Sequence, residues 1–335
     1  MLGYGFLHAL IILRGRKRPK SFLHNKNIKK YLDSCHAIRI IFSMTKIVEI
    51  TNKRYPRLLK QIPGAPSKLY YKGKWDQDIF KNCLAVVGSR RMTRYGKDCA
   101  RVMVTAAVEA GLTIVSGFMY GIDAAAHQAA VDAGGRTIAA MPCGIDLIHP
   151  AYQDKLYQEI LDNNGLILSE YPAKTEPQNW TYPQRNRIVA GLSQATLVVE
   201  AALKSGSLIT ARLARQYKRR LFAMPGPVNN VTSQGTLKLI NDGAQMAVCP
   251  QDILTFYGID TAAISKKQRD AVSPLEKRII TALVFGPMEI DELILRVKLP
   301  INELSATLSH LELNGFIKEY SGKYHLNAEV LDHAG

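Results

Sequence analysis

Short apolar runs alternate with helix-like segments through the middle of the chain, and this alternation most limits the possible folds. The runs lie at residues 84–87, 112–116, 137–141, 166–170, 195–200, 221–225 and 244–248. Most are followed by a turn and a segment with the apolar spacing of an amphipathic helix. Continuous apolar runs are typical of strands buried on both faces of a parallel sheet. The pattern predicts an α/β fold: an extended Rossmann-like, doubly wound, mostly parallel sheet of about seven strands.

Composition divides the 335 residues into five segments. They are a basic N-terminal arm at 1–43, a lead-in at 44–83, a Rossmann-like domain at 84–260, a polar linker at 261–272 and a small domain at 273–327. The arm shows neither a strand pattern nor a helix pattern. Two interpretations of it stay open: a solvated basic tail, or a stretch upstream of a true start at Met44.

The net charge is +16, and most of the positive excess precedes residue 84. A basic excess favours polyanionic partners, because neutralised phosphates release their counterions. The five cysteines are scattered without a CxxC pair, which is typical of reduced thiols in the cytoplasm. The apolar residues 1–13 are too few to span a bilayer and precede a basic run, so we expect neither a membrane span nor a signal peptide.

Ligands of parallel sheets bind at the carboxyl ends of the strands, so the residues after each apolar run are candidates for function. Glycine and serine follow the first two runs. A tight turn there exposes backbone amides to an anion near a helix N-terminus. The candidates are Gly88, Ser89, Ser116, Gly117 and Gly121. A purely structural role stays open, since any short strand-to-helix turn favours glycine.

Cationic and small polar residues occupy two further segments, which we expect to be loops at the same edge of the sheet. Arginine binds phosphate through two parallel hydrogen bonds, so these residues predict a phosphate site. Trp180 and Tyr182 flank the segment QRNR, and each is either a base-stacking residue of a single-strand binder or an anchor to the core. The polar candidates are Arg90, Arg185, Asn186, Arg187, Lys204, Ser205, Gly206 and Ser207.

The common cofactor and catalytic fingerprints are absent from the sequence. No GxGxxG follows the first run, and no GxxxxGK[ST] occurs; the segment KSGSLITA resembles a nucleotide-binding loop only in its small residues. No HExxH, nucleophile elbow or pair of catalytic carboxylates is visible. We therefore predict no catalytic residue, no cofactor and no metal.

Several motifs occur in a fixed order: LAVVGSR, IVSGFMYGIDAAAH, YPQRNRIVAGLS and LVVEAALKSGSLITARLA. Together they resemble the DNA-processing protein A (DprA) family over about residues 53–255. The resemblance implies an extended Rossmann core that binds single-stranded DNA, forms homodimers and helps to load a RecA-type recombinase onto incoming DNA during natural transformation. The family's contacts carry over to Arg90, Arg185, Arg187, Lys204, Ser205 and Ser207.

One departure from the family concerns the second turn. Met119 and Tyr120 stand where the family usually has Ala-Arg, so a phosphate-binding arginine is lost. Tyr120 can replace it only by stacking or by a neutral hydrogen bond. Asp123 and His127 match the family, but we expect them to cap and pack a helix.

The C-terminal segment reads SPLEKRIITALVFGP, MEIDELILRV, LPINELSATLSHLELNGFI and KEYSGKYHL. Three short helices and a glycine-centred hairpin predict a winged-helix domain. Its third helix carries no Arg or Lys, which a helix entering a DNA groove needs to approach the phosphates. We therefore favour protein interaction, or no separate role, over duplex DNA binding.

Three functions compete. The first is a cytoplasmic single-stranded DNA binding and recombinase-loading protein, which explains the cations, the aromatics and the missing catalytic residues together. The second is a phosphoribohydrolase-like enzyme acting on nucleoside monophosphates, for which Glu200 is the nearest carboxylate, although the PGGxGTxxE motif is missing. The third is a transcription regulator acting through the winged helix. The first is the predicted function.

Overall fold

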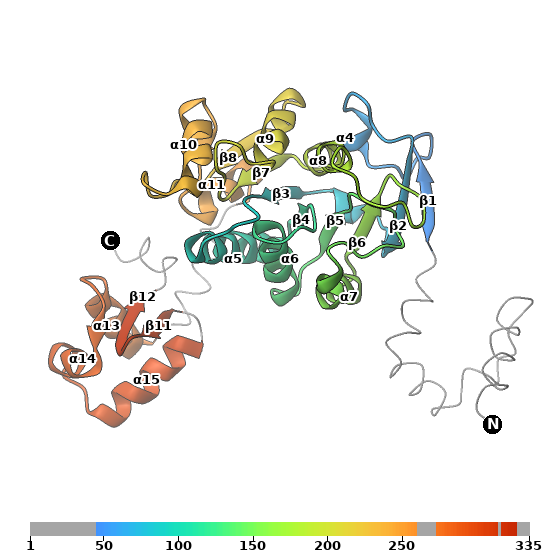
Figure 1. Cartoon of the computed structure of the whole chain (residues 1–335). Coiled ribbons are helices and arrows are strands. Elements are labelled where there is room, and N and C mark those ends of the chain that lie inside the picture. Colours follow the sequence, from blue (N-terminus) through green and yellow to red (C-terminus); the bar gives the residue numbers. More distant parts are fainter. Residues whose placement is uncertain (1–44, 260–272, 314–315, 327–335) are drawn as a thin grey trace, which may run out of the picture.

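The computed structural model describes residues 45–259, 273–313 and 316–326 (Figure 1). The predicted arm at 1–43 and the whole linker at 261–272 lie outside these residues. The described part of the chain forms one large sheet with helices on both faces and one small helical domain with its own sheet.

The large sheet has nine strands in the order β1-β2-β6-β5-β4-β3-β7-β8-β9. Strands β3 to β9 are parallel and coincide with the seven apolar runs of the sequence. The strands are β1 (Lys46–Glu49), β2 (Lys68–Gly73), β3 (Cys83–Val87), β4 (Thr113–Ser116), β5 (Thr137–Ala140), β6 (Leu166–Ser169), β7 (Ala195–Val198), β8 (Arg220–Ala223) and β9 (Gln245–Met246).

The predicted strand count of about seven is too low by the two antiparallel strands β1 and β2. Both come from the lead-in at 44–83, which extends the main sheet. β2 pairs with β6, with Tyr70 opposite Ser169, and β1 pairs with β2 at the edge. Only Val48 is buried in β1. In β2 the buried residues are Leu69, Tyr71 and Lys72, so neither strand has a continuous apolar run.

Helices cover both faces of the sheet, as Figure 1 shows. Residues of β3 alternate between two apolar clusters: Ala85 and Val87 face one side, and Leu84 and Val86 face the other. The first face is covered by α4 (Arg57–Lys60), α8 (Thr181–Leu192), α9 (Ser207–Gln216) and α10 (Gln234–Asn241); the second by α5 (Arg94–Glu109), α6 (Ile122–Asp132), α7 (Asp154–Asp162) and α11 (Pro250–Leu254).

The winding direction of the sheet reverses beside β3. From β3 the chain winds through α5, α6 and α7 to β6, and it then crosses by α8 to β7 on the other side of β3. Such a reversal separates the loops that follow the two central strands and leaves a crevice between them. The residues after β3 and β7 therefore border the position where this class of sheet binds its ligand.

The C-terminal domain is a winged helix, as the sequence predicts. Its elements are α13 (Pro274–Leu283), β10 (Met288–Glu289), α14 (Ile290–Val297), α15 (Ile301–Leu313), β11 (Ile317–Tyr320) and β12 (Lys323–Leu326), with strand order β10-β12-β11. Ile279, Leu293, Leu304 and Leu308 form its buried core. Within the described residues of both domains, no helix is long and apolar enough to cross a membrane.

Candidate nucleic-acid interface

The loop after β3 turns sharply and is held by backbone contacts. The Ser89 amide donates to the Glu200 carbonyl oxygen at 2.7 Å, and the Ser89 hydroxyl accepts from the Arg91 amide at 3.0 Å. A Cβ on Gly88 would lie 2.6 Å from the Ile122 side chain, so only glycine fits there without a shift. Gly88 and Ser89 thus shape the loop and leave Arg90 exposed at its tip.

The start of α6 packs directly against this loop. Gly121 has φ of +83°, and a Cβ on it would lie 2.2 Å from the Ser89 carbonyl oxygen. The Ile122 amide donates to that oxygen at 3.1 Å. Because an amide of α6 is already used by the loop, Gly121 serves close packing of two turns, and the anion-binding surface is set by side chains such as Arg90.

Glu200 closes the other side of the loop, at the end of β7. Its carboxylate accepts from the Thr93 amide at 2.8 Å, from the Thr93 hydroxyl at 2.6 Å and from the Thr232 hydroxyl at 2.9 Å. Glu200 is 1% exposed. Thr93 in turn caps α5 by accepting from the Gly96 amide. The carboxylate therefore joins the loop after β3 to the short 3₁₀ helix η4 (Val231–Ser233).

Two tyrosines hold the Arg90 side chain. The Arg90 guanidinium carbon lies 5.0 Å from the centre of the Tyr182 ring and 5.7 Å from that of the Tyr120 ring, both within cation–π range. The Tyr182 hydroxyl is 2.8 Å from Nε2 of His149. Burial, and secondly the charge of Arg90, lower the pKa of His149. The result is an exposed cation between aromatic rings at the switch point of the sheet.

Arg185 lies inside the molecule, in α8. The prediction that it lies in a loop outside the core is wrong, since it is 3% exposed and its Nη1 donates to the carbonyl oxygens of Gly117 and Ala140. These are strand-end carbonyls of β4 and β5 that have no further strand to pair with. Burial lowers the pKa of Arg185, and Asp123 opposes this shift. Arg185 thus fixes the strand ends beneath the loops.

Arg187 also lies in α8 and not in a loop. It forms an ion pair with Glu170 after β6, and the two side chains are only 14% and 10% exposed. Asn186 lies between the two arginines: its Oδ1 accepts from Arg185 Nε at 3.1 Å, and its Nδ2 donates to the Gly206 carbonyl oxygen at 3.4 Å. The segment QRNR therefore connects β6, α8 and the turn after β7.

The turn after β7 leads into α9 and remains open to solvent. Lys204 and Gly206 are exposed, and nothing lies within 4 Å of a Cβ built on Gly206. The Ser205 and Ser207 hydroxyls are 2.7 Å apart. Ser207 begins α9, whose first amides donate within the turn to Ser205 and Gly206, while the helix dipole favours an anion at this end. This turn follows β7, the strand that pairs with β3, and Arg90 lies in the loop after β3.

The remaining candidates divide into one exposed residue and three buried ones. Trp180 is 60% exposed and makes an edge contact with Tyr171, with ring centres 5.9 Å apart. Ser116 is fully buried and donates to the Val86 carbonyl oxygen at 2.6 Å. Asp123 and His127 lie in the interior as packing residues. Ser116 thus joins two strands and offers no hydroxyl to a ligand.

His127 is held as a neutral ring. Its Nδ1 is 2.7 Å from the Thr137 hydroxyl, which itself donates to the Ile114 carbonyl oxygen, so Nδ1 carries the hydrogen. Nε2 is buried with no hydrogen-bond partner among the described residues. Burial lowers the pKa of His127 to about 3 and raises that of Asp123.

The structure brings together Gly88, Ser89, Arg90, Gly121 and Tyr182 on one side of the crevice. Asn186 meets the turn of Lys204–Ser207 on the other. No role for His149 could be predicted from the sequence, and Glu200 was predicted only as a strand-end carboxylate. The signal for Glu200 was its position directly after β7. An exposed cation, a lysine-bearing helix start and aromatic rings can bind a chain of phosphates with bases attached.

Fold and site together define a Rossmann-like anion-binding protein with an appended winged helix. Residues 46–258 match the family of DNA recombination-mediator protein A, and residues 264–323 match the DprA winged helix domain. The chain belongs to the DNA recombination-mediator protein A family.

Relatives and solved structures agree with this assignment. Protein Smf of Synechocystis is 34% identical over 305 residues, 80% of this chain and 76% of the relative. DNA processing protein DprA of Streptococcus pneumoniae is 41% identical over 203 residues, which are 61% of this chain and 71% of the relative. The X-ray structure of DprA from Streptococcus pneumoniae superposes with a TM-score of 0.60 and covers 68% of this chain and 80% of that chain. DNA processing protein A of Helicobacter pylori, whose structure addresses its single-stranded DNA binding mode, has 34% identity and a TM-score of 0.57, covering 64% of this chain and 97% of that chain.

Proposed function

We propose that this protein binds single-stranded DNA without sequence preference and helps to load a RecA-type recombinase onto incoming DNA during natural transformation. The observation that carries the proposal is the exposed Arg90 guanidinium held between Tyr120 and Tyr182 at the switch point of the sheet. Family membership and the single-strand binding of the Helicobacter relative support it.

We assign phosphate binding to the exposed cationic side chains. Arg90 and Lys204 face solvent after the neighbouring strands β3 and β7, and Ser205 and Ser207 supply hydroxyls at the start of α9. Arg185 and Arg187 act as positioning residues, because their guanidinium groups already hold carbonyl oxygens and Glu170. Removing either should disturb the interface indirectly.

We assign base stacking to the aromatic residues near this edge of the sheet. Trp180 has an exposed ring, Tyr120 is 41% exposed, and Tyr182 is partly exposed at the same edge. Stacking on an aromatic ring accepts any base, since every base has a π-face. Tyr120 then replaces the usual family arginine by holding Arg90 and by stacking.

A hydrolytic role is disfavoured by the state of Glu200. This carboxylate is 1% exposed and accepts hydrogen bonds from Thr93 and Thr232, so it can neither reach a substrate nor take up a proton without breaking the loop. We propose that the protein has no catalytic turnover. Incubation with nucleoside monophosphates checks this: release of a free base would establish the phosphoribohydrolase function instead.

The partners are also proposals. We propose a homodimer, supported by exposed Met246 and Val248 at the open sheet edge formed by β9, where apolar side chains favour association. The site of action is proposed to be the cytoplasm, which fits the scattered cysteines and the lack of a CxxC pair. Light scattering of the full chain, and of Met246→Lys, tests the dimer.

The decisive experiment compares single-stranded with double-stranded DNA in gel shifts over a range of salt concentrations. We expect tighter binding to the single strand and a steep fall with salt. Arg90→Ala should weaken binding and reduce the slope of log K against log salt by about 0.7, the value for one phosphate on a single strand. Arg101→Ala, an exposed arginine on α5, is the matched control. Equal or tighter binding to duplex DNA would reject the proposal.

A further inference from the structure

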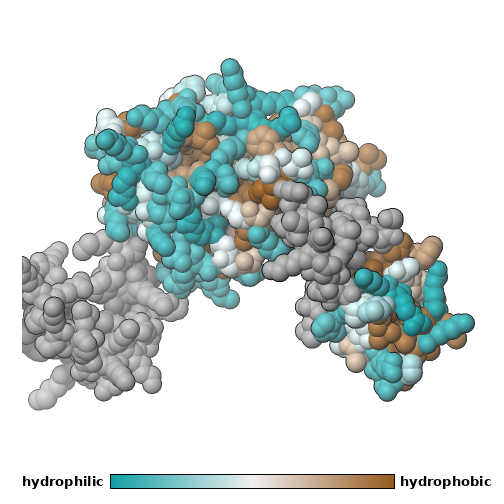
Figure 2. Space-filling model, turned by 180° about the vertical axis from the view of Figure 1, so that it is seen from behind, coloured by the Kyte–Doolittle hydropathy of each residue, from teal (hydrophilic) through white to brown (hydrophobic). Residues whose placement is uncertain are grey.

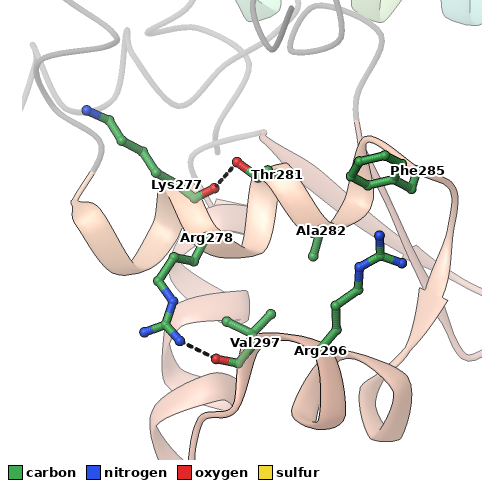
Figure 3. A pocket seen from close by; sticks show the side chains of 7 residues that line it. All are labelled: Lys277, Arg278, Thr281, Ala282, Phe285, Arg296 and Val297. Carbon is green, nitrogen blue, oxygen red and sulfur yellow. Dashed lines mark hydrogen bonds between the residues drawn. The ribbon is translucent and has the colours of Figure 1, made fainter.

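A surface groove on the winged-helix domain lies apart from the proposed DNA site. It consists of two adjoining hollows of about 330 and 480 Å³ that share Phe285 and Arg296 as walls. In Figure 3 one hollow is bordered by residues of α13 above, by Arg296 and Val297 of α14 below, and by Phe285 at one end. The second continues past Phe285 along Pro287, Met288 and Leu295.

The groove exposes large apolar side chains. Phe285 is 73% exposed and Leu295 78%, although the domain buries a complete core of its own. Figure 2 shows hydrophobic residues on the surface of this domain beside hydrophilic ones. The Arg296 guanidinium lies 4.6 Å from the centre of the Phe285 ring, which holds both side chains at the groove. Apolar surface that the fold leaves uncovered in this way marks an interaction site.

The charges around the groove are positive. Lys277, Arg278 and Arg296 line it, and none of them forms an ion pair within the described residues. Arg278 donates to the Val297 carbonyl oxygen and keeps its charge at the rim. The one acidic lining residue, Glu292, accepts from the Glu289 amide at 3.0 Å and thereby caps α14. The groove therefore complements an anionic partner that also carries apolar groups.

A protein segment fits these features better than a nucleic acid does. A winged helix approaches DNA with its third helix and wing, but α15 has no Lys or Arg and exposes Glu303 and Glu312. The wing carries Lys318 and Lys323, the latter paired with Glu289. The other cations lie around α13 and α14, and those that line the groove are next to Phe285 and Leu295. Apolar anchors beside a basic rim match an acidic segment with bulky apolar residues, docked as a helix or strand in a groove.

We propose that this groove binds an acidic segment of a partner protein. A bulky apolar side chain of the segment packs between Phe285 and Leu295, and its Asp or Glu residues pair with Arg296, Lys277 and Arg278. The arrangement separates two tasks within the chain, with DNA at the strand ends of the large sheet and a protein partner on the winged helix.

The test uses the full chain and short fluorescent synthetic peptides. One peptide set carries Leu or Phe flanked by Asp and Glu; the other carries the same apolar residues flanked by Asn and Gln. Fluorescence anisotropy should show the acidic set binding at least about tenfold more tightly, and Arg296→Glu or Leu295→Ala should each weaken it by about tenfold, the scale of an interface hot spot. Lys318→Glu and Ile301→Ala, exposed residues of the same domain outside the groove, are the matched controls and should bind normally.

Thermal unfolding of each variant checks the fold, and Lys277→Glu replaces Arg296→Glu should the latter be unstable. Equal binding of the two peptide sets overturns the proposal, as does normal binding by the groove variants. Parallel gel shifts test the competing occupant. Loss of DNA binding in Arg296→Glu with no peptide preference would assign the groove to nucleic acid and reject a protein partner.

Discussion

The guanidinium of Arg185 occupies the space in which a side chain on Gly117 would have to lie: a Cβ built on Gly117 is 2.6 Å from Arg185 Cζ. The same guanidinium donates to the Gly117 carbonyl oxygen. Arg185 can therefore be buried at this strand end only because Gly117 has no side chain.

Gly117→Ala should destabilise the protein, because the added methyl group displaces Arg185 from its two carbonyl oxygens. We expect a loss of about 2 kcal/mol, the scale of buried hydrogen-bond donors and acceptors left unpaired. Urea unfolding measures it. Gly206→Ala is the control, since its Cβ meets nothing within 4 Å, and it should change the free energy of unfolding by less than about 0.5 kcal/mol. Similar losses in both variants would contradict the arrangement.

Arg185→Ala and Arg90→Ala should separate stability from binding. The first leaves the buried carboxylate of Asp123 without its opposite charge and should cost about 3 kcal/mol. The second removes an exposed side chain and should cost less than about 0.5 kcal/mol while weakening DNA binding. Urea unfolding and gel shifts on the same preparations test this. Comparable unfolding free energies for the two variants would show that Arg185 is not a buried structural group.

Glu200→Gln should loosen the loop that carries Arg90. Glutamine keeps one acceptor oxygen but sets an amide N–H₂ against the donors of Thr93 or Thr232, which leaves at least one buried donor unpaired. We expect about 1–3 kcal/mol of destabilisation and weaker DNA binding. Thr232→Val removes the hydroxyl that reaches Glu200 and Asn230 but leaves the two contacts of Thr93 to Glu200, so it should have a smaller effect on both. A stable Glu200→Gln variant with normal binding would show that the carboxylate does not position the loop.

Stability should fall as pH drops below about 6.5, the usual pKa of histidine. Burial holds the pKa of His127 at about 3, so between these two values the unfolded chain binds a proton that the folded chain refuses. One such group contributes a slope of about 1.4 kcal/mol per pH unit, with stability rising as pH rises. Urea midpoints at a series of pH values give the slope. It should shrink in His127→Gln, and an unchanged slope would contradict a neutral buried ring.

The parallel strands β3 to β8 could be predicted from the sequence because each is a mostly buried, continuous apolar run. β9 exposes both of its residues at the sheet edge and was recognised only by the apolar run 244–248 around it. β1 and β2 could not be predicted, because they bury only part of their residues. In β1 only Val48 is buried, so four residues carry too little pattern to be recognised. The apolar runs therefore report the seven parallel strands of this sheet and miss the two antiparallel strands added by the lead-in.

The burial of the candidate arginines could be predicted for Arg90 but not for Arg185. Arg90 is exposed as expected, but Arg185 is buried by carbonyl oxygens that lie 68 and 45 residues away in the chain. No local pattern around QRNR encodes those partners, since they exist only once β4 and β5 end beside α8. The sequence alone does not distinguish an arginine that binds strand-end carbonyl oxygens from an arginine that is exposed to a ligand.

The two rings beside Arg90 also have an entropic consequence. A free arginine samples many rotamers, and immobilising such a side chain at an interface costs about 0.5–1.5 kcal/mol. Tyr120 and Tyr182 restrict the guanidinium before any ligand arrives. Part of this entropic cost is therefore incurred during folding, so in the proposed function Arg90 presents a preformed contact to a phosphate group next to any base.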